Sequence, residues 1–132
     1  MCRVHFGELS ALNFFDAVLV SEFKCLKHTA MVIHLSPEEV AAKLRCSCEL
    51  ILLDVRTPAE FLARRIPQSI NIPLDELYAR HTELDASREI IVLCEHGIRS
   101  IAASGLLSQL GFKRVFNMVG GLSRWRHETI SG

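Results

Sequence analysis

The chain has 132 residues with 15 basic and 15 acidic side chains, a length that predicts one domain able to bury a hydrophobic core. Its 49% hydrophobic content excludes a wholly disordered chain, and zero net charge removes the whole-molecule argument for binding nucleic acid or an anionic membrane. Residues 36–93 carry 7 basic and 10 acidic groups (net −3), whereas residues 94–132 carry 5 and 2 (net +3). An anion site is therefore expected in the C-terminal third.

The cysteine content and the N-terminal region give an expectation for the cellular compartment of the protein. The five cysteines are irregularly spaced, at Cys2, Cys25, Cys46, Cys48 and Cys94. An odd, sparse set argues against a secreted disulfide scaffold and favours reduced thiols in a cytoplasmic protein. The apolar run 11–20 contains Asn13 and Asp16 and is too short for a membrane span; it also lacks the flanks of a secretory signal.

Residues 1–30 differ from the rest of the chain. Leu12, Phe15, Leu19 and Phe23 recur at helical spacing, which fits an amphipathic helix. Alternatively, Met31 opens the true domain and the preceding stretch is an appendage or an upstream start. We treat 1–30 as an N-terminal extension without assigned chemistry, and 31–132 as the domain.

From residue 31 onward, strand and helix signals alternate. Apolar runs predict strands over residues 32–35, 50–55, 69–72, 89–93 and 115–118. Two capping boxes, Ser36 to Glu39 and Thr57 to Glu60, predict helix starts, the second helix reaching about Ala63. Further helices are predicted over 74–80, over 100–110 and around Trp125 after a Gly-Gly turn. Such alternation predicts an α/β fold with a mainly parallel sheet and helices on both faces.

Core positions are predicted mostly from the 100–110 helix and from the aromatic residues. The apolar face expected for this helix consists of Ile101, Ala103, Leu106, Leu107 and Leu110. Gly111 is the expected stop signal at its end. Phe112, Phe116 and Trp125 are expected in the core.

The segment that predicts chemistry runs from 90 to 104. Cys94 ends a buried strand, and the turn after it contains Gly97 and Arg99 before the helix expected from Ser100. Turn amides, the positive end of a helix and an arginine all favour the thiolate of Cys94 over the thiol. The pattern indicates a nucleophilic cysteine in an anion-binding loop. A buried structural cysteine is the alternative, but this combination of residue types at this spacing is unusual for packing alone.

The sequence resembles a single-domain rhodanese, a sulfurtransferase. Four stretches match the family pattern in order: LLDVRTPAEF (52–61), IPQSINIPLDEL (66–77), VLCEHGIRS (92–100) and GFKRVFNMVGGLSRW (111–125). The resemblance implies the rhodanese fold, a three-layer α/β/α arrangement with a five-stranded parallel sheet. It also implies that Cys94 accepts a sulfane sulfur as a persulfide and passes it to a thiophilic acceptor, cyanide in vitro or a thiol in vivo, without cofactor or metal.

The same resemblance supplies the site residues and the expected partners. Besides the catalytic Cys94, the substrate-binding residues it implies are Arg56, Glu95, His96, Gly97, Ile98, Arg99 and Ser100. Arg56 has two interpretations: an ion pair with Asp54 or Glu60, or a contact to an anionic donor. The expected partners are a small sulfur donor, thiosulfate or a persulfide, and its acceptor; a protein persulfide could take either role.

The length of the loop from the cysteine to the arginine distinguishes sulfur transfer from phosphate hydrolysis on related folds. Cys94 to Arg99 is a Cys-x4-Arg loop, whereas related phosphatases and arsenate reductases use Cys-x5-Arg, which widens the loop for a tetrahedral oxyanion. The shorter loop favours sulfur transfer. The remaining alternative is a non-catalytic rhodanese-like module that binds a partner, and the intact Cys94 and Arg99 argue against it.

The chain departs from the family pattern at two places, residues 64–69 and Glu95. Many members read Gly-His-Ile-Pro-Gly-Ala where this chain has Arg-Arg-Ile-Pro-Gln-Ser at 64–69, which predicts an altered turn and either a solvated arginine pair or a larger positive field. Glu95 follows the nucleophile directly and, unless it faces solvent, opposes a dianionic donor such as thiosulfate. Cys46 and Cys48 are too few for a zinc site; they could act as a sulfur acceptor or resolving pair.

Overall fold

A parallel five-stranded sheet lies at the centre of the structure, a computed structural model that describes residues 32–47 and 49–132. The helix predicted within residues 12–23, and Cys48, lie outside the described residues. The strands are β1 (Val32–Leu35), β2 (Ile51–Asp54), β3 (Ile70–Asn71), β4 (Ile90–Leu93) and β5 (Val115–Met118). Their order is β1-β5-β4-β2-β3, so β4 is the middle strand, and every pairing is parallel.

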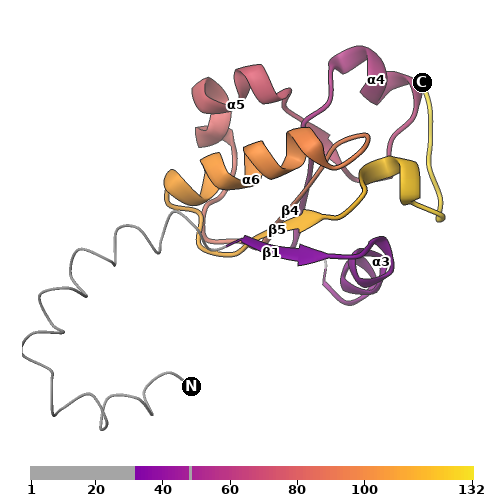
Figure 1. The fold of residues 1–132 in the computed structure, drawn as a ribbon, viewed down its shortest axis with the longest axis horizontal. Helices are drawn as coiled ribbons and strands as arrows, with labels where there is room; N and C mark the ends of the chain where they lie inside the picture. Colours follow the sequence, from indigo (N-terminus) through magenta and orange to yellow (C-terminus); the bar gives the residue numbers. More distant parts are fainter. Residues whose placement is uncertain (1–31, 48) are drawn as a thin grey trace, which may run out of the picture.

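Helices cover both faces of this sheet. They are α3 (Pro37–Cys46), α4 (Pro58–Ala63), α5 (Leu74–Arg80) and α6 (Ile98–Gln109), with short 3-10 helices η2 (His81–Glu83) and η3 (Gly121–Arg124). Figure 1 shows α5 and α6 on one face and α3 on the opposite face. In the described part of the chain, no helix is long and apolar enough to cross a membrane.

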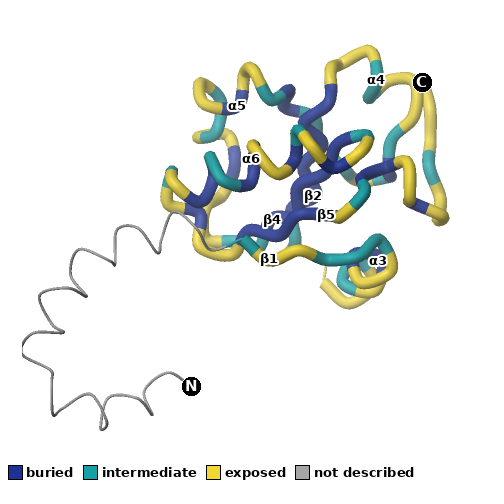
Figure 2. The backbone as a smooth tube through the Cα atoms, viewed as in Figure 1, coloured by how far each residue is buried: buried dark blue, intermediate teal, exposed yellow. Residues whose placement is uncertain are grey.

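Two layers of buried side chains join the helices to the sheet, whose inner strands β2, β4 and β5 are buried along their whole length (Figure 2). One layer packs Leu77 of α5 and Leu107 of α6 against the face that carries Cys94. The other packs Val40 of α3 and Trp125 against the opposite face. The predicted three-layer α/β/α architecture is therefore confirmed.

The sequence patterns predicted most of the helix starts, with small differences from the structure. Both capping boxes form: Ser36 with Glu39, and Thr57 with Glu60. Helix α6, however, begins at Ile98, two residues earlier than predicted, because Gly97 in a left-handed conformation serves as its N-cap. The prediction that Ile101 packs in the core is wrong: this side chain is 54% exposed.

The helix predicted around Trp125 also differs slightly from the structure. Trp125 is buried as expected, but it follows η3 instead of lying within a helix. Its indole Nε1 donates to the carbonyl of Glu128, 3.1 Å away. Phe112 and Phe116 are both buried, as predicted.

The departure from the family pattern at 64–69 does not open the turn there. The amide of Ser69 donates to the carbonyl of Ile66 at 3.2 Å, with Pro67 and Gln68 at the two central positions. Gln68 has a φ of +75°, and it is the only described non-glycine residue with a positive φ. A proline followed by a residue of positive φ is the pattern of a type II turn, whose third position favours glycine.

Replacing Gln68 by glycine should stabilise the protein. A side chain in the left-handed region costs about 1–2 kcal/mol, part of which is offset by the greater freedom of glycine in the unfolded chain. We expect the Gln68→Gly variant to gain about 0.5–1 kcal/mol in the free energy of unfolding, measured by urea denaturation. The matched control Gln109→Gly at the exposed end of α6 should lose stability instead, and a loss in both variants would contradict the strain at Gln68.

Candidate active site

Cys94 lies directly after the middle strand β4, at the carboxyl end of the sheet. Its side chain is buried, on the sheet face covered by α6. Its Sγ accepts hydrogen bonds from the amides of Gly97 at 3.1 Å and Ser100 at 3.2 Å. The thiol in turn donates to Oγ of Ser100 at 3.5 Å. The predicted convergence of turn amides on the sulfur is present.

The two amides converge because the turn ends at a glycine. Gly97 has a φ of +95°, a conformation that residues with a β-carbon rarely adopt. This conformation caps α6, so Ser100 lies in the first turn of the helix, where backbone N–H groups have no partner within the helix. The sulfur of Cys94 accepts the hydrogen bond from the amide of Ser100 in place of a carbonyl within the helix. The positive end of the helix thus faces the sulfur, an arrangement that favours an anion.

The short helix η3, which follows β5, supports the cysteine loop from the side. The amide of Leu122 donates to the carbonyl of Cys94 at 2.8 Å, and that of Ser123 donates to the carbonyl of Glu95 at 2.9 Å. This close approach depends on Gly121, because a β-carbon there would lie 2.5 Å from both carbonyl oxygens. From the sequence, Gly120 and Gly121 predict only a turn; a pair of glycines after a buried strand is also the signal that two backbone segments can approach closely.

Adding one methyl group at Gly121 should therefore disrupt the site. Gly121→Ala meets backbone that cannot move freely, at a φ of +67°, and should cost about 2–4 kcal/mol of unfolding free energy. Gly105→Ala is the matched control, since a β-carbon there meets nothing within 4 Å and the helix should gain up to about 1 kcal/mol. Similar urea midpoints for the two variants would contradict the close approach.

Arg99 is paired with a carboxylate and is not among the donors to the sulfur. Its two terminal nitrogens contact the carboxylate oxygens of Glu60 at 2.9 and 3.1 Å. The hydrogen bond from Arg99 lowers the pKa of Glu60 to about 2, while the same bond raises the pKa of Arg99. Because a lowered carboxylate pKa stabilises the ionised folded state, this contribution is complete at neutral pH and is lost as pH falls from about 4.5 towards 2. Arg99 thus brings its positive charge to the site as one half of an ion pair.

Arg56 connects the end of β2 to the cysteine loop. Its guanidinium donates to both carboxylate oxygens of the buried Asp54, with a shortest contact of 2.7 Å. It also donates to Oε1 of Glu95 at 3.1 Å and to the carbonyl of Arg64 at 2.6 Å. Burial alone would lower the pKa of Arg56, but the hydrogen bond and charge of Asp54, with the charges of Glu95 and Glu60, raise it.

Glu95 therefore neither faces open solvent nor projects an unpaired charge at the sulfur. Its side chain is 26% exposed and is held by Arg56. Of the two pairings considered for Arg56, the one with Asp54 forms. Arg64 is exposed and donates to the carbonyl of Leu122 at 3.3 Å, and the half-buried Arg65 lies over the ring of Phe61.

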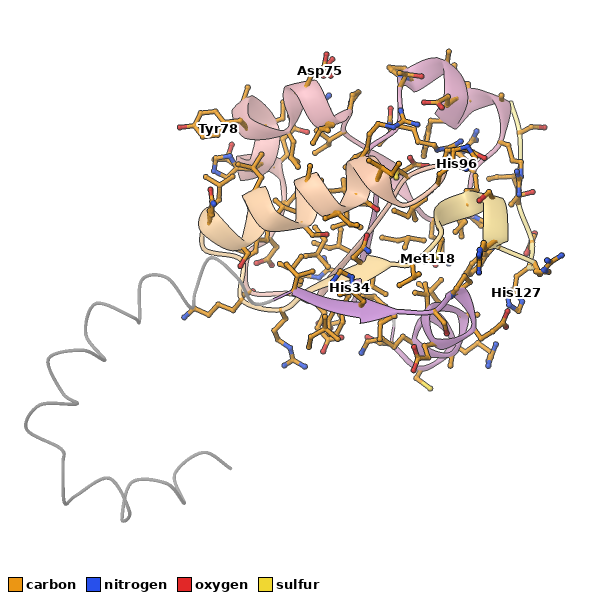
Figure 3. All side chains as sticks on the ribbon, in the orientation of Figure 1. His34, Asp75, Tyr78, His96, Met118 and His127 are labelled. Atoms are coloured by element: carbon orange, nitrogen blue, oxygen red, sulfur yellow. The ribbon has the colours of Figure 1, made fainter. Side chains whose placement is uncertain are left out.

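The remaining sequence candidates lie at the surface. His96 and Ile98 are exposed in and after the loop, and Figure 3 shows His96 at the end of the molecule where α4 lies. Cys46 is an exposed thiol that ends α3, on the sheet face opposite Cys94. Among the described residues, no group of three or more His, Cys, Asp or Glu side chains could hold a metal ion.

Comparison with known proteins gives a family for this architecture. The family profile described as the Rhodanese-like domain matches residues 36–128. The chain belongs to the rhodanese-like domain family. A sulfurtransferase of Allochromatium vinosum is 34% identical over 98 residues, covering 74% of this chain and 92% of the relative. The thiosulfate sulfurtransferase GlpE of Pseudomonas syringae is 33% identical over 100 residues, covering 73% and 93%.

A solved structure matches this rhodanese-like domain along most of its length. The crystal structure of a rhodanese-related protein from Thermoplasma volcanium superposes with a TM-score of 0.68 at 31% identity, covering 74% of this chain and 97% of that one. The predicted resemblance is confirmed, and the chain is a member of a family of rhodanese-type sulfurtransferases.

Proposed function

We propose that this rhodanese-like protein is an active sulfurtransferase in which Cys94 carries the transferred sulfur as a persulfide. The observation that carries the proposal is the pair of amide hydrogen bonds, from Gly97 and Ser100, to the Sγ atom of Cys94 at the end of β4. Amide donors of this kind stabilise an anionic sulfur, and the thiolate is the nucleophilic form of cysteine. A purely structural cysteine needs neither donor.

The first half of the reaction loads the cysteine. The Cys94 thiolate attacks the sulfane sulfur of a donor, a new S–S bond forms, and the bond between that sulfur and the donor breaks. The leaving group departs with the electron pair: sulfite from thiosulfate, or a thiolate from an organic persulfide. The sulfane sulfur keeps its oxidation state, so the step requires no external oxidant or reductant.

The second half unloads the cysteine. A thiophilic acceptor, cyanide in vitro or a thiol in the cell, attacks the outer sulfur of the Cys94 persulfide, and the Cys94 thiolate leaves. The same two amides that hold the starting thiolate then stabilise it as leaving group. We assign this chemistry to the cytoplasm, where thiols remain reduced; both described cysteines, Cys46 and Cys94, are free thiols.

The other residues take supporting roles in this proposal. The loop residues Glu95, His96, Gly97, Ile98, Arg99 and Ser100 surround the transferred sulfur and contact the substrates. Arg56 acts as a positioning residue: its guanidinium is buried and holds the loop through Glu95. The partners are then a small sulfur donor and its acceptor, either of which a protein persulfide or thiol can replace.

Intact-protein mass spectrometry tests this proposal. Incubation with thiosulfate or with an organic persulfide should add the mass of one sulfur, 32 Da, to the protein, and subsequent cyanide should remove it as thiocyanate. Peptide mapping should place the added sulfur on Cys94 and not on the exposed Cys46. Absence of the mass gain with every donor would overturn the proposal and favour a non-catalytic binding module.

A further inference from the structure

Two arginines at the cysteine loop, Arg56 and Arg99, are already matched by carboxylates. Arg99 pairs with Glu60 through two hydrogen bonds, and Arg56 pairs with Asp54 and Glu95. These two cations and three anions sum to a charge of −1, and adding Arg64, whose guanidinium donates to the carbonyl of Leu122 beside the loop, brings the sum to 0. The immediate surroundings of Cys94 therefore offer no net positive charge to an incoming donor, although residues 94–132 as a whole are basic.

Sulfur donors differ in charge, so this balance selects among them. Thiosulfate carries two negative charges at neutral pH, whereas an organic persulfide with an uncharged carbon part carries one or none. We propose that Glu60 is a specificity-determining residue that neutralises Arg99 and thereby makes the site selective for organic persulfides of low charge over thiosulfate. This inference rests on the proposed sulfur transfer by Cys94 and adds the class of donor.

We assign this role to Glu60 because it neutralises Arg99, the arginine that a donor can reach. The Arg99 side chain is 35% exposed, whereas that of Arg56 is 3% exposed. Glu60 is itself fixed by the start of α4, where its Oε1 accepts hydrogen bonds from the amide and the hydroxyl of Thr57 at 2.9 and 3.1 Å. With its pKa near 2, Glu60 stays ionised throughout any practical assay range.

The surface next to Arg99 also suits a donor with a carbon part. A groove of about 460 Å³ lies beside this arginine, within the size range of small-molecule sites. Its lining is mostly apolar and consists of Val55, Thr57, Pro73, Leu74, Asp75 and Arg99. Two lining residues relate this groove to the cysteine: Val55 belongs to the same buried cluster as Cys94, and Arg99 belongs to the loop that follows Cys94. The apolar side chains of this groove suit the carbon part of an organic persulfide, and its one cation, Arg99, is already paired with Glu60.

The Glu60→Gln variant separates charge from structure. Glutamine retains an oxygen that accepts from Thr57, so the capping box survives, but it leaves Arg99 unneutralised. The measurement is the second-order rate of the 32 Da gain with thiosulfate and with hydroxyethyl persulfide. At low ionic strength we expect thiosulfate loading to rise about three- to tenfold, and persulfide loading to stay within about twofold. Raising the salt concentration to 0.5 M should shrink the thiosulfate gain, since exposed charges are screened.

Two controls show whether the effect runs through Arg99. Glu83→Gln removes a carboxylate that pairs with Arg80 by two similar hydrogen bonds at an exposed position, and it should leave both rates unchanged. In an Arg99→Gln background, Glu60→Gln should no longer raise thiosulfate loading, because the cation it unmasks is gone. A gain that persists in this background would overturn the assignment.

The unsubstituted protein provides a test that does not depend on any variant folding. With no net positive charge at the loop, raising salt should leave its thiosulfate loading unchanged or faster; a fall of threefold or more would reveal net attraction and overturn the inference. Unchanged thiosulfate loading in Glu60→Gln would do the same. If neither donor adds sulfur to the unsubstituted protein, the proposed sulfur transfer by Cys94 is wrong. That result differs from the two results above, which would overturn only the role of Glu60.

Discussion

Replacing Cys94 with serine is expected to abolish sulfur transfer. Serine keeps the size of the side chain and can accept hydrogen bonds from the amides of Gly97 and Ser100. Its hydroxyl, however, stays protonated at neutral pH, and oxygen cannot carry a sulfane sulfur as a persulfide. We expect the rate of thiocyanate formation to fall by about a thousandfold or more, together with complete loss of the 32 Da gain.

The control for this variant is the other described thiol. Cys46→Ser changes an exposed side chain on the opposite face of the sheet and should leave transfer within about twofold. Circular dichroism and urea denaturation should show both variants folded. Persistent transfer in Cys94→Ser would mean that another thiol carries the sulfur, and equal losses in both variants would point to damage unrelated to the nucleophile.

Removing the charge of Arg56 is expected to cause the largest loss of stability. Asp54 is fully buried, and Arg56, 2% exposed, is its ion-pair partner. In Arg56→Met the carboxylate of Asp54 keeps only a backbone donor, which leaves a buried charge without a counter-ion. Such losses amount to about 3–5 kcal/mol of unfolding free energy. Urea denaturation at pH 7 measures this loss of unfolding free energy.

Two comparisons distinguish an uncompensated buried charge from lost surface pairing. Arg80→Met also removes an arginine with two carboxylate partners, Glu76 and Glu83, but at the surface, so it should cost no more than about 1 kcal/mol. The double variant Asp54→Leu with Arg56→Met removes both buried charges and should recover much of the single-variant loss. If Arg56→Met costs as little as Arg80→Met, the buried pair does not carry this stability.

The loss of Arg56 should also slow sulfur loading in whatever fraction remains folded. Its Nη1 atom holds Glu95, the residue next to Cys94, at 3.1 Å. Without this contact the cysteine loop retains the support of η3, but Glu95 becomes free to move towards an anionic donor. Thiosulfate loading should therefore suffer more than loading from an uncharged persulfide, which connects this variant to the charge selectivity proposed for Glu60.

The sequence by itself determined the elements and the nucleophile loop. The five strands, both capping boxes and the position of Cys94 at the end of a buried strand depend on hydrophobic runs and on residues three or four apart, such as Thr57 and Glu60. Gly97 and Ser100 reach the sulfur of Cys94 for the same reason: they are three and six residues away, within one turn. Interactions this local are set by backbone geometry, which residue spacing encodes.

Only the tertiary structure decided which charges pair and which loops touch. Arg99 with Glu60 and Arg56 with Glu95 are each 39 residues apart, and in a chain with 15 acidic groups the sequence contains many equally plausible partners. The contact of Gly121 with the Cys94 carbonyl likewise depends on two loops being brought together by neighbouring strands β4 and β5. Packing of the whole sheet fixes these distances, and through them the charge that a sulfur donor meets.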